Sequence, residues 1–370
     1  MIRTLVVGSG QRVRNAALPA LLSRPETFEL AGIRSRKAKT IEAAGTEHSV
    51  LDFGPDGEHG DLGAAVAAAD LIYVCVSKGA VPGVLAKLAA ATRGAGRPVD
   101  LLIDTPVLLF KHLYAAKHFA AFGRVWVAED MWTLPWVETL ERAREQQDLG
   151  APKHLVLDRS AYAYHGLALA KTLLGEWNLL AARRTPRGVV PEGEAKAGER
   201  AFERELWFAG ERTCHVTEPR DYALGRFRLE HDTSAVLADR PGPGVDQVVE
   251  PIVEERPDGL RWLGFRVGDT ETRLAPHEVE LLGVLEPRED DSVIARMDAL
   301  KKVGFARLFD RIAEGTGAWP LEEGLDDMWV DYLLEKVGRW RATPLTSCRA
   351  SLALSAVGLL TGTIARLRRS

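Results

Sequence analysis

Short apolar runs alternate with helix-compatible segments through the first 150 residues of this chain. Five of the runs have the length and apolar content of buried strands: 4–8, 28–36, 70–77, 100–104 and 124–130. Segments with helical spacing separate them, including 81–94 and a short one that begins at Thr40. Strands that alternate with helices at this spacing predict an α/β fold with a doubly wound, parallel sheet of Rossmann type.

The pattern changes after about residue 150. A strand at 154–160 and a helix at 165–176 precede long runs between 204 and 283, in which polar and apolar residues alternate. Such alternation is typical of an antiparallel sheet with one covered face. Helical patterns return from Asp290, whereas the polar, Gly- and Pro-rich segment 185–200 has the composition of a loop.

These patterns predict three parts. Residues 1–150 form a Rossmann-type domain. Residues 151–345 form an α+β domain with an open, mainly antiparallel sheet, which serves the substrate and the oligomer. Residues 346–370 form a C-terminal helix that packs back on the first domain.

Composition limits the possible partners and location. The 370 residues carry a net charge of −4, so no basic excess indicates a nucleic-acid partner. Cys75, Cys214 and Cys348 are too far apart for a metal-binding motif, which favours a reducing compartment and argues against a zinc site. No apolar run reaches the roughly 20 residues of a membrane span, and no signal-peptide pattern precedes the first strand. We expect a soluble, cytoplasmic protein with no metal and no membrane partner.

The first strand runs directly into a glycine-containing turn. Glycines after the first strand of a βαβ unit let the backbone approach a pyrophosphate at the N-terminus of the next helix. Val13 stands where the usual fingerprint has its third glycine, and a tight turn without a ligand is the alternative. We predict dinucleotide contacts from the whole turn: Gly8, Ser9, Gly10, Gln11 and Arg12.

Pro19 affects the helix that follows this turn. Because proline disrupts a helix interior, we expect the helix to begin near Ala16 with Asn15 as its cap, or else to kink. A late start would lengthen the phosphate loop.

The second strand ends in Arg34, Ser35, Arg36 and Lys37, with no acidic residue. An NAD-selective site places Asp or Glu here to bind the ribose 2′-hydroxyl, whereas a hydroxyl and a guanidinium suit a 2′-phosphate. We therefore predict that Ser35 and Arg36 bind NADP(H) in preference to NAD(H). The alternative is a solvated basic turn.

Four landmarks follow one another along most of the chain. They are the Gly-x-Gly turn, the strand 70–77, the tripeptide Asp104-Thr105-Pro106 and the segment 164–176 ahead of a large sheet. In this order they resemble the glucose–fructose oxidoreductase/inositol dehydrogenase (Gfo/Idh/MocA) family. The resemblance implies a small-molecule substrate and a homo-oligomer that uses the exposed face of the sheet. We also expect Ser77 and Asp104, at two strand ends, to contact the cofactor.

Two departures from this family fall on catalytic positions. The tripeptide is similar to the family's Glu-Lys-Pro, in which the lysine orients substrate and cofactor and tunes proton transfer. Thr105 keeps a hydrogen-bonding hydroxyl but supplies no charge. His165, ten residues before Gly175, matches the family's proton-transferring histidine, whereas the aspartate common four residues earlier is Ala161 here.

The sequence thus predicts an NADP(H)-dependent oxidoreductase that moves a hydride to or from a small carbonyl, alcohol or imine. His165, helped by Tyr164 or Thr105, transfers the proton. The missing lysine favours a less usual substrate, such as the imines that some divergent relatives reduce. A non-catalytic cofactor-binding paralog and a non-redox enzyme on the same fold are the alternatives, so enzymatic activity itself stays open.

Other polar residues lie near these strand ends. Alternation along a strand predicts that Tyr162 and Tyr164 share a face. Lys78 follows a central strand and can reach a phosphate or a substrate acid. Glu129 and Asp130 are either solvent-exposed loop acids or substrate ligands.

Overall fold

The computed structural model describes residues 1–53, 62–192, 194 and 196–342. These residues divide into two compact units: unit 1 includes 1–129 and 305–329, and unit 2 consists of 130–304 and 330–342. The predicted boundary near residue 150 lies inside unit 2, because Asp130 to Leu149 belong with that unit and place Trp136 in its core. The predicted helix at 346–370 lies outside the described residues.

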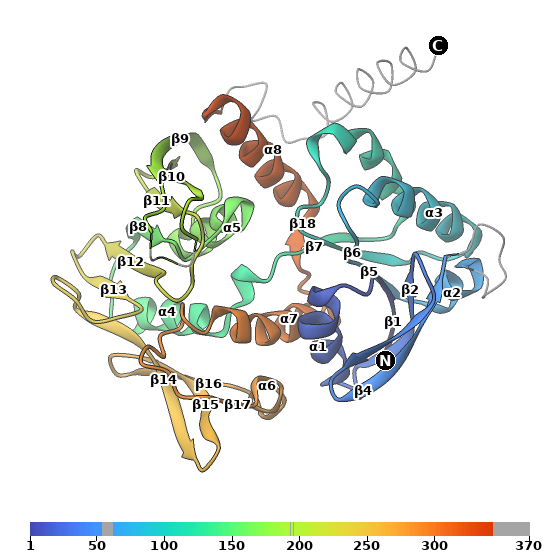
Figure 1. Cartoon of the computed structure of the whole chain (residues 1–370), viewed down its shortest axis with the longest axis horizontal. Helices are drawn as coiled ribbons and strands as arrows, with labels where there is room; N and C mark the ends of the chain where they lie inside the picture. The colour runs from blue at the N-terminus through green and yellow to red at the C-terminus, as the bar shows by residue number, and fades with distance from the viewer. Residues whose placement is uncertain (54–61, 193, 195, 343–370) are drawn as a thin grey trace. The chain divides into compact units, whose positions relative to one another are not determined.

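Unit 1 is built on one sheet (Figure 1). Its strands are β1 (Ile2–Val7), β2 (Phe28–Ser35), β3 (Lys39–Ala43), β4 (Thr46–Asp52), β5 (Leu71–Val74), β6 (Asp100–Asp104), β7 (Val125–Ala128) and β18 (Trp319–Pro320). They follow the order β18-β7-β6-β5-β1-β2-β4-β3, parallel from β7 to β4 with an antiparallel strand at each edge. The order reverses between β1 and β5, and sheets of this kind bind ligands at the carboxyl ends beside such a reversal. The predicted doubly wound sheet is confirmed.

The helical elements of unit 1 are η1 (Val13–Ala17), α1 (Leu18–Leu22), α2 (Leu62–Ala68), α3 (Val81–Gly94), η2 (Phe110–Ala121), the end of α7 (Met297–Ala313) and the start of α8 (Leu321–Val337). The α7 end packs on the sheet, where Phe305 and Phe309 contact the ring of Tyr73. The helix predicted from Thr40 is wrong. Ile41 and Ala43 are buried while their neighbours are exposed, and this alternation suits the β3 strand that pairs with β4.

Pro19 bends the first helix without delaying its start. The backbone N–H of Arg14 donates to the Gly10 carbonyl at 3.1 Å, so helical bonding begins directly after the glycine turn. The next turn is a π-helix, η1, in which the Leu18 N–H donates to Val13, five residues back. This widening suits Pro19, which has no N–H to offer the carbonyl of Asn15. The predicted late start is wrong, the predicted kink takes the form of a π-turn, and the loop stays short.

Unit 2 is built on a larger, mainly antiparallel sheet, as predicted (Figure 1). Its strands are β8 (Pro152–Asp158), β9 (Leu179–Val189), β10 (Arg200–Phe208), β11 (Thr213–Glu218), β12 (Arg226–His231), β13 (Val236–Ala238), β14 (Gln247–Arg256), β15 (Gly259–Val267), β16 (Thr270–Arg273), β17 (Val284–Leu285) and β19 (Arg339–Arg341). The order is β16-β15-β14-β13-β12-β8-β11-β10-β9-β19, with β17 beside β15. The pairs β8–β11 and β13–β14 are parallel.

Helices cover one face of this sheet and enclose the core of unit 2. They are η3 (Met131–Thr133), α4 (Pro135–Gln146), α5 (Ala163–Leu174), α6 (Pro276–Leu282) and the remaining parts of α7 and α8. Trp136 of α4 stacks on Phe227 of β12 with ring centroids 5.1 Å apart. The predicted loop 185–200 is partly wrong, because β9 continues to Val189. The extended run expected up to residue 283 ends earlier, because Pro276 begins α6. No helix among the described residues is long and apolar enough to cross a membrane.

Candidate functional site

The two glycines of the first turn have different reasons to be glycine. Gly8 has φ +130°, and a Cβ built there would lie 1.9 Å from the Cys75 carbonyl oxygen at the end of β5. Only glycine fits at position 8, because the backbone there lies too close to the end of β5 to leave room for a side chain. A Cβ on Gly10 would meet nothing within 4 Å, so the protein itself does not require this glycine. The space above Gly10 and the helix that starts behind it suit a phosphate-bearing ligand.

The residues predicted to bind the 2′-phosphate on the ribose of NADP(H) lie at the end of β2. The Ser35 hydroxyl donates to the Lys37 carbonyl at 2.9 Å, which closes a turn in which Arg36 is exposed. Arg34 is buried, and its guanidinium donates to the Asp52 carbonyl at 3.3 Å. Arg36 and Lys37 are thus the side chains of this turn that a ligand can reach.

Asp104, at the end of β6, is the centre of a polar cluster in unit 1. Its carboxylate lies 2.7 Å from Nε of Arg12 and 3.7 Å from Nζ of Lys78, and it accepts a hydrogen bond from the Cys75 thiol at 3.2 Å. Burial, helped by the neighbouring Asp104, raises the pKa of Cys75 to about 12, so the thiol stays protonated and donates. Two cations therefore share one buried carboxylate at the carboxyl edge of β5 and β6.

The remaining predicted residues of unit 1 differ in exposure. Ser9 is half-buried, and Gln11 and Ser77 are exposed. Thr105 is 9% exposed, and its hydroxyl has no hydrogen-bond partner among the described residues. Buried hydroxyls normally have a partner, so this unpaired group next to Asp104 is a candidate ligand contact.

In unit 2, His165 lies in the first turn of α5 and is 8% exposed. A carboxylate oxygen of Asp130 comes within 4.8 Å of a ring nitrogen of His165, and the ring of Tyr164 lies 4.5 Å from the imidazole between centroids. Glu129 and Asp130 are 2% and 0% exposed, so the interpretation of both as solvent-exposed loop acids is wrong. Asp130 is thus placed to act on His165, where Ala161 cannot.

The prediction that Tyr162 and Tyr164 share one face of a strand is wrong. Tyr162 precedes α5 and Tyr164 lies in it, and their rings meet edge to face at 6.5 Å. Tyr162 is half-exposed, and burial together with the carboxylates of Asp331 and Glu218 raises its pKa. Tyr164 is therefore the tyrosine that contacts His165.

A buried ionic network holds the start of α5. Glu218 accepts a hydrogen bond from the Ala163 N–H at 3.0 Å and lies 3.1 Å from Nε of Arg204, which also donates to Asp331 at 2.7 Å. No local sequence pattern indicates this network, because its members lie on β11, β10 and α8. His215, on the same strand as Glu218, faces Glu203.

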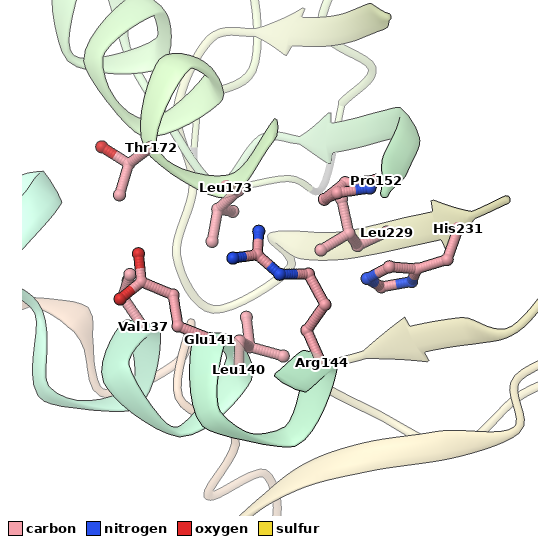
Figure 2. A pocket seen from close by; sticks show the side chains of 9 residues that line it. All are labelled: Val137, Leu140, Glu141, Arg144, Pro152, Thr172, Leu173, Leu229 and His231. Atoms are coloured by element: carbon pink, nitrogen blue, oxygen red, sulfur yellow. The ribbon is translucent and has the colours of Figure 1, made fainter. Parts of the chain in front are cut away.

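A small pocket lies in unit 2 between α4, α5 and β12 (Figure 2). Figure 2 shows the Arg144 guanidinium pointing from α4 toward α5, with His231 on the adjacent strand. A Cβ on Gly175 would lie 3.6 Å from this guanidinium, so Arg144 stands close to the C-terminal end of α5, where a cation is favourable. None of the predicted site residues lines the pocket.

Comparisons with known structures show which solved proteins have a similar fold. An oxidoreductase from Thermotoga maritima matches with 13% identity over 92% of this chain and 98% of its own, at a TM-score of 0.56. The WlbA dehydrogenase from Bordetella pertussis, solved with NADH and UDP-GlcNAcA, matches with 13% identity over 92% and 98%, at 0.53. A super-repressor mutant of Gal80p from Saccharomyces cerevisiae matches with 10% identity over 93% and 99%, at 0.59.

These matches show that the chain shares with those proteins a two-part fold that combines a Rossmann sheet with a larger mixed sheet. This likeness of fold agrees with the resemblance seen in the sequence. No protein-family model and no curated protein matches the sequence itself. The likeness is therefore one of fold.

Proposed function

We propose that this protein is an NADP(H)-dependent oxidoreductase acting on a small carbonyl, alcohol or imine. The observation that supports a dinucleotide most directly is the first turn, where Gly10 faces open space and helical bonding begins at once. The fold supports the same class, since the similar WlbA dehydrogenase was solved with NADH. The bound nicotinamide supplies or accepts the hydride.

The residues of the chain position the ligand and move the proton. The turn Gly8 to Arg12 receives the pyrophosphate, and Ser35 with Arg36 binds the 2′-phosphate of the adenosine half. His165 gives a proton to the substrate oxygen or nitrogen during reduction and removes it during oxidation. Asp130, within 4.8 Å, stabilises the protonated imidazole, and Tyr164 and Thr105 offer hydroxyls for the substrate.

The test is a titration of the purified protein with NADPH and NADH, followed by nicotinamide fluorescence. A charge-assisted contact is worth about 1.5–3 kcal/mol, so Arg36→Ala should weaken NADPH binding by roughly 10- to 100-fold and leave NADH binding nearly unchanged. Arg93→Ala, which removes an exposed arginine at the end of α3, is the matched control and should change neither.

The outcomes separate the specificity from the function. Equal losses for NADPH and NADH in Arg36→Ala would remove the preference for NADP(H) but keep a dinucleotide site. No binding of either nucleotide by the wild-type protein would contradict the proposal itself. Product formation without an absorbance change at 340 nm would favour a non-redox enzyme.

A further inference from the structure

Lys78 is a partly buried cation at the carboxyl edge of the sheet, beside β5. It follows β5 by four residues, and its side chain is 23% exposed. Its ammonium donates to the Asp104 carbonyl at 3.2 Å and lies 3.7 Å from the Asp104 carboxylate. An ammonium has three N–H donors, and among the described residues Nζ has no acceptor outside Asp104.

The Asp104 carboxylate, which Lys78 contacts, also contacts Arg12, and Asp104 precedes Thr105, whose hydroxyl is a second unused donor. Arg12 neutralises the Asp104 carboxylate from the other side at 2.7 Å, so the three side chains together carry an excess of one positive charge. Thr105, the next residue of the chain, has a buried hydroxyl with no partner in the described part of the protein. A spare N–H and a spare hydroxyl beside one strand end suit an oxygen atom of a ligand.

The strand order indicates which part of a dinucleotide would reach these groups. The proposed 2′-phosphate contacts lie at β2 and the pyrophosphate turn at β1, whereas Lys78 and Thr105 lie beyond the reversal, at β5 and β6. A dinucleotide lies across this reversal. We propose that Lys78, with Thr105, binds an oxygen of the nicotinamide half of the cofactor, an inference that rests on the proposed function.

The protonation state of Lys78 makes this contact sensitive to pH. Burial lowers the pKa of Lys78, and the nearby Asp104 carboxylate offsets part of that effect. The other titratable or charged groups around it are Cys75 and Arg12, and His112 of η2 faces its backbone. Because the charged form binds an oxygen more tightly, affinity for the nicotinamide half should fall as the pH rises through this lowered pKa.

The experiment compares NADPH with 2′-phospho-ADP, which keeps the pyrophosphate but lacks the nicotinamide and its ribose. Lys78→Met should weaken NADPH binding about tenfold and leave 2′-phospho-ADP binding within about twofold, whereas Lys78→Arg should retain most of the NADPH affinity. Between neutral pH and about pH 10, NADPH affinity should fall in the wild type and stay level in both variants. Lys87→Met, on the exposed face of α3, is the control.

Two results would overturn the inference while the proposed function stands. One is a Lys78→Met protein that binds NADPH as Lys87→Met does. The other is an equal loss for both ligands, which would mean that Lys78 only supports the loop around Asp104. A wild-type protein that binds neither NADPH nor NADH would instead remove the proposed function.

Discussion

Gly8→Ala is expected to lower the stability of the protein by about 3 to 5 kcal/mol. The new Cβ would lie 1.9 Å from the Cys75 carbonyl oxygen, and the backbone would have to keep φ +130° with a side chain present. Neither problem is relieved by moving a flexible side chain, because the clash is with the backbone at the end of β5. Thermal unfolding followed by circular dichroism should show a melting temperature lower by roughly 10 °C.

Gly10→Ala is the matched control for this prediction. Among the described residues outside its own turn, no atom lies within 4 Å of the position that its Cβ would occupy, so its melting temperature should stay within about 1 °C of the wild type. Its dinucleotide affinity should fall instead, because the methyl group fills the space proposed for the pyrophosphate. Equal melting temperatures for Gly8→Ala and the wild type would contradict the close approach of β1 and β5.

Arg204→Met is expected to destabilise the protein by about 3 to 5 kcal/mol, because it leaves two carboxylates without their shared cation. The Arg204 side chain is 5% exposed and lies between Glu218 and Asp331. Glu218 also accepts a hydrogen bond from the Ala163 N–H at the start of α5. The loss of stability should therefore extend to the turn that carries His165. Urea unfolding at neutral pH measures the effect.

The pH dependence gives this prediction a definite sign. Burial already raises the pKa of Asp331, and Arg204 opposes that rise. Without Arg204 the Asp331 pKa rises further, so the folded variant binds a proton more tightly than the unfolded chain. Its stability deficit should therefore be largest at neutral pH and shrink as the pH falls toward about 5.

Arg183→Met provides the comparison on a neighbouring strand. Arg183 pairs with Glu205 in an exposed ion pair, with its side chain 60% exposed. Pairs of this kind contribute about 0 to 1 kcal/mol, so this variant should unfold almost like the wild type. If both variants lost the same small amount of stability, the buried network would not hold α5 as described.

Much of unit 1 could be predicted because its elements are defined by local pattern. The β5 strand is buried on both faces, and the carboxyl end of β6 was located from five consecutive residues. The glycine turn was also found in this way, whereas His165 at the start of α5 was found through the resemblance to the Gfo/Idh/MocA family. The prediction failed where tertiary contacts decide: 40–43 pairs with β4 instead of forming a helix, and Pro19 is accommodated by a π-turn.

The sequence by itself determined the alternation of strands and helices, the antiparallel sheet and the candidate residues Gly10 and Arg36, and its resemblance to a known family added Thr105 and His165. Only the tertiary structure decided their partners: Gly8 against Cys75, Lys78 and Arg12 on Asp104, and Arg204 between Glu218 and Asp331. The physical reason is that periodicity reports which face of an element is buried. The charged and polar groups that meet across elements are set by strand order and register, which no local pattern records.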